Sequence, residues 1–150
     1  MIYRAAEVAD VPVLHAMLSD LARHEGSNGV GSVEALTRGG FGPRPLFQAV
    51  LAEDTRPCGM AIYYPDFSTH RGQPGVYVQD LFVDPVARGA GVGRGLLAAV
   101  MRLQDWDARY LTLGVSPDNE VALGFYARTG FRPRGYRFMI LDGEGLEALQ

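Results

Sequence analysis

The most constraining feature of this 150-residue chain is the stretch Val76 to Leu97, VYVQDLFVDPVARGAGVGRGLL. Its first half combines β-branched, aromatic and other apolar residues, which predicts a strand. A turn at Asp84-Pro85 leads through a glycine-rich run, 88–93, into an apolar helical stretch from about Arg94. Glycines let a ligand approach the backbone, and the free N–H groups of a first helical turn point at it. The stretch therefore predicts an anion site for a ligand that carries phosphate.

Two well-known phosphate-binding patterns do not fit this glycine run. A Walker A loop needs Gly-Lys-Ser or Gly-Lys-Thr after its glycines, and the chain contains no lysine. A dinucleotide fingerprint, G-x-G-x-x-G, fails in both registers because its third glycine falls on Arg94 or on Leu96. What remains is R-G-x-G-x-G after a strand that ends in L-F-V. At this point a glycine-rich turn without a ligand stays an alternative.

Length and composition limit the number of domains and the kinds of partner that we expect. The length is typical of one domain with its own core, so we expect residues 1–150 to form a single domain. A net charge of −3 does not favour a nucleic-acid partner. One cysteine, Cys58, forms neither an internal disulfide nor a cysteine metal cluster. Without a signal core or a membrane-spanning apolar run, we expect a cytoplasmic protein with no membrane contact.

The order of elements predicts the fold class. We expect strands at 2–5, 46–52, 58–64, 76–83, 109–115 and 131–140. We expect helices at 11–24, 34–36, 92–104, 119–129 and 144–149, and loops at 38–45 and 65–74. Hairpins alternate with helical crossovers in this order, which predicts an α/β (α+β) protein with a mixed sheet and helices on both faces.

A second motif lies downstream in SPDNEVALGFYARTGF. Its residues Asn119, Ala122, Tyr126, Gly130 and Phe131 fit the pattern Asn-x-x-A-x-x-x-Tyr-x-x-x-G-F. Together with the glycine run, this motif resembles the GNAT N-acetyltransferase superfamily in spacing and in element order. The resemblance implies the GNAT fold, a mostly antiparallel central sheet whose strands splay apart at the acetyl-CoA site. It also implies acetyl-CoA as the co-substrate. No cluster of His, Asp or Glu in the sequence has metal-ligand spacing, so we expect no metal.

The first half of the chain narrows the resemblance. The segments LARHEG, GGFGPRPLFQAVLAE and YYPDFSTHRGQPGVYVQDLFV resemble the spermidine/spermine acetyltransferase-like branch, with its diamine and thialysine acetyltransferase relatives. This implies transfer of an acetyl group to a primary amine of a small cationic substrate (polyamine, diamine or lysine-like) by direct attack in a ternary complex. Relatives of this branch are homodimers, and their C-terminal strand often helps to form the interface, so we expect a homodimer.

One departure from the branch leaves the substrate open. Its Y-L-E-D reads Tyr77-Val78-Gln79-Asp80 here, so Gln79 stands where a glutamate usually binds the amine. Glutamine neither accepts a proton at neutral pH nor pairs ionically with an ammonium group. A protein or peptide amine, an antibiotic amine and a non-catalytic acyl-CoA-binding module therefore stay alternatives.

The resemblance also implies the groups that hold acetyl-CoA. The thioester oxygen would accept from the backbone N–H groups of Leu81, Phe82 and Val83. The phosphates would accept from those of Gly89, Ala90, Gly91, Val92, Gly93 and Arg94. Arg88 and Arg94 would add positive charge. Asn119 would cap its helix and contact the CoA arm. Tyr126 would donate a proton to the leaving thiolate, a modestly uphill step because the pKa is about 10 for tyrosine and about 8.5 for a thiol.

The group that removes the proton from the amine is the open question. Glu25, by resemblance, would hold a cationic amine at the end of the first long helix. His24 beside it has a suitable ordinary pKa, about 6.5. Asp80 is a third candidate base. Neighbouring residues of a strand point to opposite faces, so we expect that Gln79 and Asp80 do not line the same pocket.

Overall fold

The structure, a computed structural model, describes residues 1–27 and 29–150. These residues form two compact units, Met1–Gly114 and Val115–Gln150, and each is described by itself. The expectation of a single domain stays a prediction.

The first unit is built on a five-stranded sheet. Its strands are β1 (Ile2–Ala5), β2 (Gln48–Glu53), β3 (Pro57–Ser68), β4 (Gln73–Val83) and β5 (Leu111–Leu113). They lie in the order β1-β2-β3-β4-β5, with antiparallel pairing throughout except between β4 and β5, which are parallel. This confirms the mixed, mostly antiparallel sheet that the resemblance implies.

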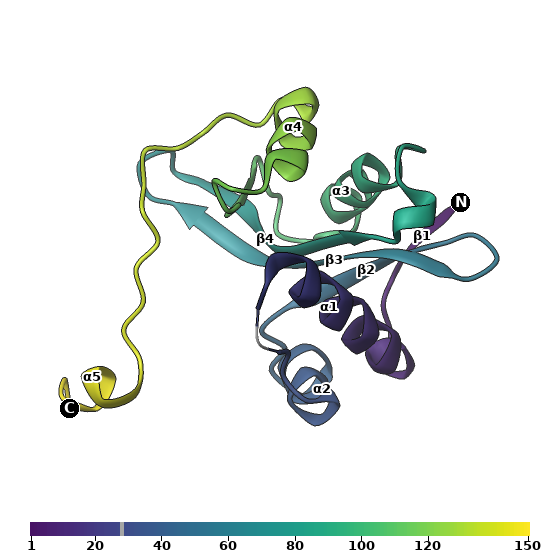
Figure 1. The fold of residues 1–150 in the computed structure, drawn as a ribbon. Coiled ribbons are helices and arrows are strands. Elements are labelled where there is room, and N and C mark those ends of the chain that lie inside the picture. The colour runs from purple at the N-terminus through teal and green to yellow at the C-terminus, as the bar shows by residue number, and fades with distance from the viewer. Residues whose placement is uncertain (28) are drawn as a thin grey trace. The chain divides into compact units, whose positions relative to one another are not determined.

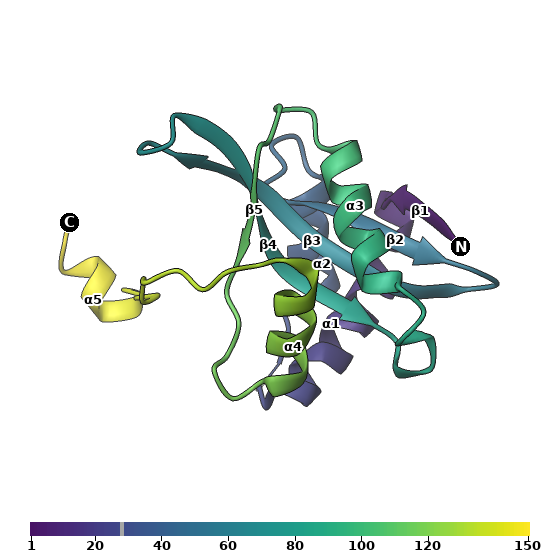
Figure 2. The ribbon, with the colours of Figure 1, turned by 90° about the horizontal axis from the view of Figure 1, so that it is seen from above.

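Helices cover both faces of this sheet. They are α1 (Val11–Glu25), α2 (Val33–Phe41) and α3 (Val92–Leu103), with short 3-10 turns at Val8–Asp10 and Pro85–Ala87. Figure 1 shows α1 and α2 on one face and α3 on the other, and the view from above in Figure 2 agrees. The expected helices on both faces are therefore confirmed.

Alternation along the strands builds a core on each face. Toward α1 and α2, one buried cluster joins helix and strand side chains: Leu14, Met17, Leu18, Ala49, Leu51, Met60, Ile62 and Phe82. The intervening residues Val50, Ala52 and Ala61 are fully buried as well. Because successive strand residues point to opposite faces, these three lie toward α3, whose Leu96 and Val100 are also fully buried. Leu103, the last residue of α3, is 37% exposed.

Two predicted loops are shorter than expected. The helix α2 continues through Arg38 to Phe41, and its glycines are used in packing, because a Cβ at Gly40 would overlap the Phe47 ring. Within the predicted loop 65–74, β3 continues to Ser68 and β4 begins at Gln73, so the two strands form a longer hairpin than expected. Pro74 is tolerated there because it faces β5: its carbonyl accepts from Arg109 N at 2.8 Å.

The second unit contains α4 (Glu120–Thr129) and α5 (Gly143–Glu147). Asn119 caps α4 as predicted, since its side-chain oxygen accepts from Ala122 N at 3.1 Å. The predicted strand at 131–140 is wrong for this structure, which has no strand in that segment. A strand forms only against a neighbouring strand, so local sequence preference alone does not produce one.

Gly59 allows α3 to pack closely on β3. A Cβ there would lie 3.0 Å from the Phe82 carbonyl oxygen and 3.1 Å from Leu96 Cδ1. We expect Gly59→Ala to lower the free energy of unfolding by about 1–3 kcal/mol, measured by urea denaturation, because overpacking forces backbone or helix shifts. Gly31→Ala is the matched control, since its Cβ would meet only Ala35 Cβ at 3.8 Å. Equal stabilities of the two variants would contradict this reading of the packing.

Candidate functional site

The strands β4 and β5 separate halfway along β4. Their pairing joins Val76–Val78 to Leu111–Leu113 and ends there. From Gln79 to Val83, β4 pairs with β3 on one side, and no strand of the described residues pairs with its other side. This is the splay that the resemblance implies, and it leaves backbone groups of β4 open to a ligand.

An extra residue in β4 decides which groups face this gap. Val76 N donates to Tyr110 O at 2.9 Å, toward β5, whereas Asp84 N donates to Cys58 O at 2.8 Å, toward β3. Strict alternation over eight residues would send both groups the same way. The register shifts opposite Ile62 and Tyr63, where Gln79 is left unpaired, and this bulge reverses the alternation.

The reversed alternation turns the N–H groups of Leu81 and Val83 toward the gap and that of Phe82 toward β3. Arg88 Nε donates to the Val83 carbonyl at 3.0 Å, which places this guanidinium at the same edge. Two of the three predicted donors for a thioester oxygen therefore face the gap. Phe82, the third, has its side chain buried in the core cluster between the sheet and α1.

The glycine-rich loop after β4 has the geometry expected of an anion site. Gly89 and Gly91 adopt positive φ values of 83° and 79°, which favour glycine. The helix α3 begins at Val92, and its first helical hydrogen bond runs from Gly95 N to Gly91 O at 3.0 Å. The preceding N–H groups of the first turn, up to Arg94, thus have no helical partner. Arg88 and Arg94 are exposed, and the first turn contains no acidic residue.

Two carboxylates come together at the bulge. Asp80 is half-buried on β4, and Glu25 is the last residue of α1, on the face of the sheet that α1 covers. Burial, and then the negative charge of Glu25, raise the pKa of Asp80 to about 6. A carboxylate with this pKa is ionised at neutral pH and is a better proton acceptor than an ordinary aspartate.

The bulge also corrects the expectation that Gln79 and Asp80 lie on opposite faces. Tyr64 Oη donates to Gln79 Oε1 at 3.1 Å, and Asp80 is among the groups that raise the pKa of the same Tyr64, after burial. In a bulge, two successive residues oppose one residue of the partner strand, so their side chains lie on one face. Gln79 and Asp80 therefore border the same site.

Sequence reasoning missed the tyrosines of this site. Tyr64 on β3 and Tyr77 on β4 are paired across the strands, and their rings stack with centroids 5.1 Å apart. The available signal was the dipeptide Tyr63-Tyr64. Alternation along β3 buries the first ring and turns the second toward the face of the sheet where Asp80 lies.

His24 is less well placed than Glu25. Its ring Nδ1 is 2.8 Å from the Asp20 carbonyl of its own helix, so this nitrogen carries the proton and donates. The ring is exposed at the surface of α1. Its predicted role at the substrate stays a prediction.

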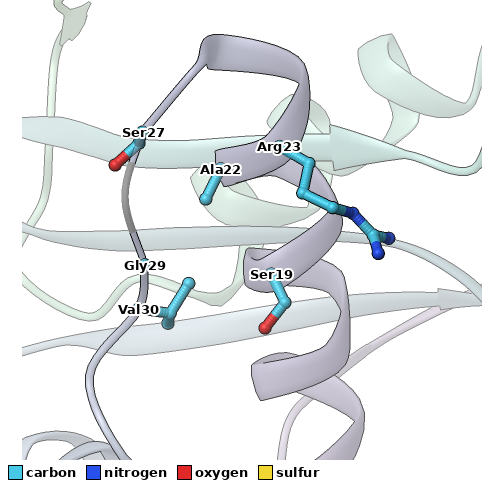
Figure 3. Close-up of a pocket in the computed structure, with 6 residues that line it drawn as sticks. All are labelled: Ser19, Ala22, Arg23, Ser27, Gly29 and Val30. Atoms are coloured by element: carbon cyan, nitrogen blue, oxygen red, sulfur yellow. The ribbon is translucent and has the colours of Figure 1, made fainter.

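A hollow of about 290 Å³ lies beside the last turns of α1, lined by Ser19, Ala22, Arg23, Ser27, Gly29 and Val30. Figure 3 shows the Arg23 side chain directed away from it. The lining includes no predicted site residue. We place the chemistry at the bulge of β4 instead, because the titratable groups gather there.

The remaining predicted residues belong to the second unit. Tyr126 lies on α4, with its ring 5.3 Å from those of Phe125 and of Phe131, measured between centroids. The contacts of Asn119 and Tyr126 with CoA stay predictions. Across residues 1–27 and 29–150, no three His, Cys, Asp or Glu side chains are grouped so that they could hold a metal ion. In that part of the chain, none of the helices has the length and apolar character needed to cross a membrane.

Comparisons with known proteins agree with this geometry. Residues 17–131 match the sequence profile of the Acetyltransferase (GNAT) family. Over 162 residues, 97% of this chain and 95% of the relative, the chain is 27% identical to the Thialysine N-epsilon-acetyltransferase of Bos taurus. It is 34% identical to the Peptidyl-lysine N-acetyltransferase YjaB of Escherichia coli (strain K12), over 69% of this chain and 60% of that protein. The solved integron cassette protein VCH_CASS6 of V. cholerae has a TM-score of 0.80 at 21% identity, covering 99% of this chain and 96% of that one.

The fold is thus that of an acetyl-transfer enzyme. The chain belongs to the GNAT acetyltransferase family, and thialysine acetyltransferase and spermidine/spermine acetyltransferase-like relatives support the branch. Enzymes of this family use acetyl-CoA as co-substrate.

The glycine-rich loop gives a prediction about this co-substrate. Arg94 is exposed at the first turn of α3. We expect Arg94→Ala to weaken acetyl-CoA binding roughly tenfold, because a charge-assisted contact to phosphate is lost, as measured by calorimetry at low salt. Arg44→Ala, which removes an exposed arginine between α2 and β2, should leave the affinity unchanged. The assignment fails if both variants bind acetyl-CoA equally well.

Proposed function

We propose that the protein is an N-acetyltransferase that moves the acetyl group of acetyl-CoA to a primary amine of a small cationic molecule, such as a polyamine, a diamine or a lysine-like amine. The observation that carries this proposal is the pair of carboxylates, Asp80 and Glu25, beside the gap in the sheet. Burial, and then the negative charge of Glu25, raise the pKa of Asp80 to about 6. Two negative groups suit a cation, and one of them is set for proton transfer.

In the proposed reaction, Glu25 holds the ammonium group and Asp80 removes its proton, because an ammonium has no lone pair. The raised pKa of Asp80 makes this transfer less uphill, since an amine has a pKa of about 10.4. The nitrogen attacks the thioester carbonyl carbon, and the N–H groups of Leu81 and Val83 stabilise the negative oxygen. The C–S bond then breaks, and Tyr126 gives a proton to the CoA thiolate. The nitrogen, which became positively charged on attack, releases its second proton, and this proton restores the Tyr126 hydroxyl directly or through solvent.

A lysine side chain of a protein or peptide is the second candidate acceptor. The similarity to a peptidyl-lysine N-acetyltransferase favours it, and so does Gln79, which is exposed and uncharged. A peptide substrate needs fewer fixed cation contacts than a free polyamine. Comparison of lysine-containing peptides with free amines in one assay separates the two candidates.

Release of CoA thiol in the presence of an amine panel tests the proposal. We expect wild-type activity to fall as the pH drops through about 6, because protonated Asp80 no longer accepts a proton. Asp80→Asn should lower kcat by roughly 100-fold or more, the usual contribution of a general base. Tyr126→Phe should lower kcat in the same assay. Failure of every amine and peptide to release thiol would refute the proposed function.

Thermal stability provides the control for Asp80→Asn. In the wild type, the pKa of Asp80 is raised in the folded protein, so its ionised carboxylate lowers stability at neutral pH. This cost disappears as the pH falls below the pKa that Asp80 has in the unfolded chain. The variant should therefore melt at the same or a higher temperature than the wild type at pH 7. Asp54→Asn, in the exposed turn between β2 and β3, should keep full activity. Full activity of Asp80→Asn would exclude this residue as the base.

We further propose that the enzyme is a homodimer. In the second unit the segment before α5 carries strongly exposed apolar side chains, with Met139 93% and Ile140 86% exposed. Its sequence favours a strand, and a second copy would supply the missing neighbour. Sedimentation at micromolar concentration should give a dimer, and Ile140→Lys should shift it toward monomer. A wild-type monomer at that concentration would refute the dimer.

A further inference from the structure

Tyr64, which has no part in the proposed reaction, contacts Gln79, the residue at which this chain departs from the branch pattern. Tyr64 Oη donates to Gln79 Oε1 at 3.1 Å, and the ring of Tyr64 is stacked on Tyr77 with an interplanar angle of 22°. The stack limits the movement of the ring, and so fixes the position of the hydroxyl. Burial raises the pKa of Tyr64, which keeps the hydroxyl protonated and able to donate.

The direction of this hydrogen bond orients the Gln79 amide. A carboxamide has an acceptor oxygen on one side and an N–H₂ donor on the other. Because Oε1 accepts from Tyr64, the N–H₂ group is turned away from Tyr64 and toward the open side of the site. A glutamate at the same place would offer only acceptors and a negative charge. Position 79 thus presents hydrogen-bond donors where a carboxylate would present an anion.

The neighbouring charges give the neutral amide a second effect. After burial, Glu25 from α1 raises the pKa of Asp80. After burial, Tyr77 from β4 and Asp66 from β3 raise the pKa of Tyr64. A further carboxylate at position 79, on the same face as Asp80, would oppose ionisation of Asp80. The amide therefore leaves Asp80 free to act as base while it offers its own donors to the substrate.

We propose that Tyr64 is a positioning residue that fixes the Gln79 amide, and that this pair selects amines carrying an oxygen acceptor over linear diamines of equal length. The oxygen can be a hydroxyl, a carbonyl or a carboxylate. This inference rests on the proposed function and narrows its substrate class toward amino-acid-like amines. A second ammonium group would meet the N–H₂ donors of Gln79 and be disfavoured there.

The test uses amines that differ only in their far group: 5-amino-1-pentanol, 5-aminopentanoate and cadaverine, with the corresponding four-carbon and three-carbon series. We expect the wild type to have a higher kcat/KM for the alcohol or carboxylate than for the diamine at one chain length or more. Gln79→Glu should shift this ratio toward the diamine by roughly tenfold, the size expected for exchange of one charged contact.

A double-mutant cycle tests the role of Tyr64. Tyr64→Phe should reduce the wild-type preference about threefold or more without changing the affinity for acetyl-CoA. In a Gln79→Ala background the same change should have no effect, because the two residues act through one hydrogen bond. Tyr3→Phe, at the opposite edge of the sheet on β1, is the matched control for loss of a tyrosine hydroxyl and should not alter the preference.

The outcomes separate this inference from the proposed function. If the wild type acetylates amines but Gln79→Glu leaves the ratio unchanged, the selection by Gln79 is overturned while the proposed function stands. If the effects of Tyr64→Phe and Gln79→Ala simply add, Tyr64 does not act through Gln79. If no amine is acetylated, the proposed function fails and this inference fails with it.

Discussion

One extra residue in β4 determines how the site of this protein is arranged. Without the bulge at Gln79, the N–H groups of Leu81 and Val83 would point to β3 and be used in the sheet. With it, they face the gap where β5 has ended. The same residue turns Asp80 onto the face covered by α1. In the proposed reaction, a single change of register thus supplies both the donors for an oxyanion and the carboxylate that acts as base beside it.

The rest of the fold holds this irregular segment in place. The bulged strand pairs with β3 along most of its length, and Phe82 anchors it in the core beneath α1. The same helix ends at Glu25, whose charge adds to the burial of Asp80. Ionised Asp80 therefore lowers stability at neutral pH, a cost that the packed sheet can offset. Such local costs are typical of catalytic sites, where groups are tuned for chemistry and not for folding.

Local patterns predicted the strand, the glycine-rich loop and the start of α3, because these elements follow each other within 22 residues of sequence, Val76 to Leu97. The bulge was beyond such patterns, since it depends on which residue of β3 lies opposite Gln79. Tyr64 was missed for the same reason: its hydroxyl acquires a role only when β3 and β4 pair. The apolar segment that includes Ile140 was predicted as a strand, but strand formation requires a partner that local sequence does not provide.

The glutamine at position 79 argues for a base one residue further along the strand. A glutamate there would have stood beside Asp80 on one face, and two such carboxylates share a proton rather than ionise independently. Loss of that charge leaves Asp80 with one close negative neighbour, Glu25, and a pKa of about 6. The departure from the branch pattern thus does not remove proton transfer from the site. In the proposed mechanism the acceptor is instead the half-buried Asp80, and position 79 recognises the substrate through an amide that accepts a hydrogen bond from Tyr64.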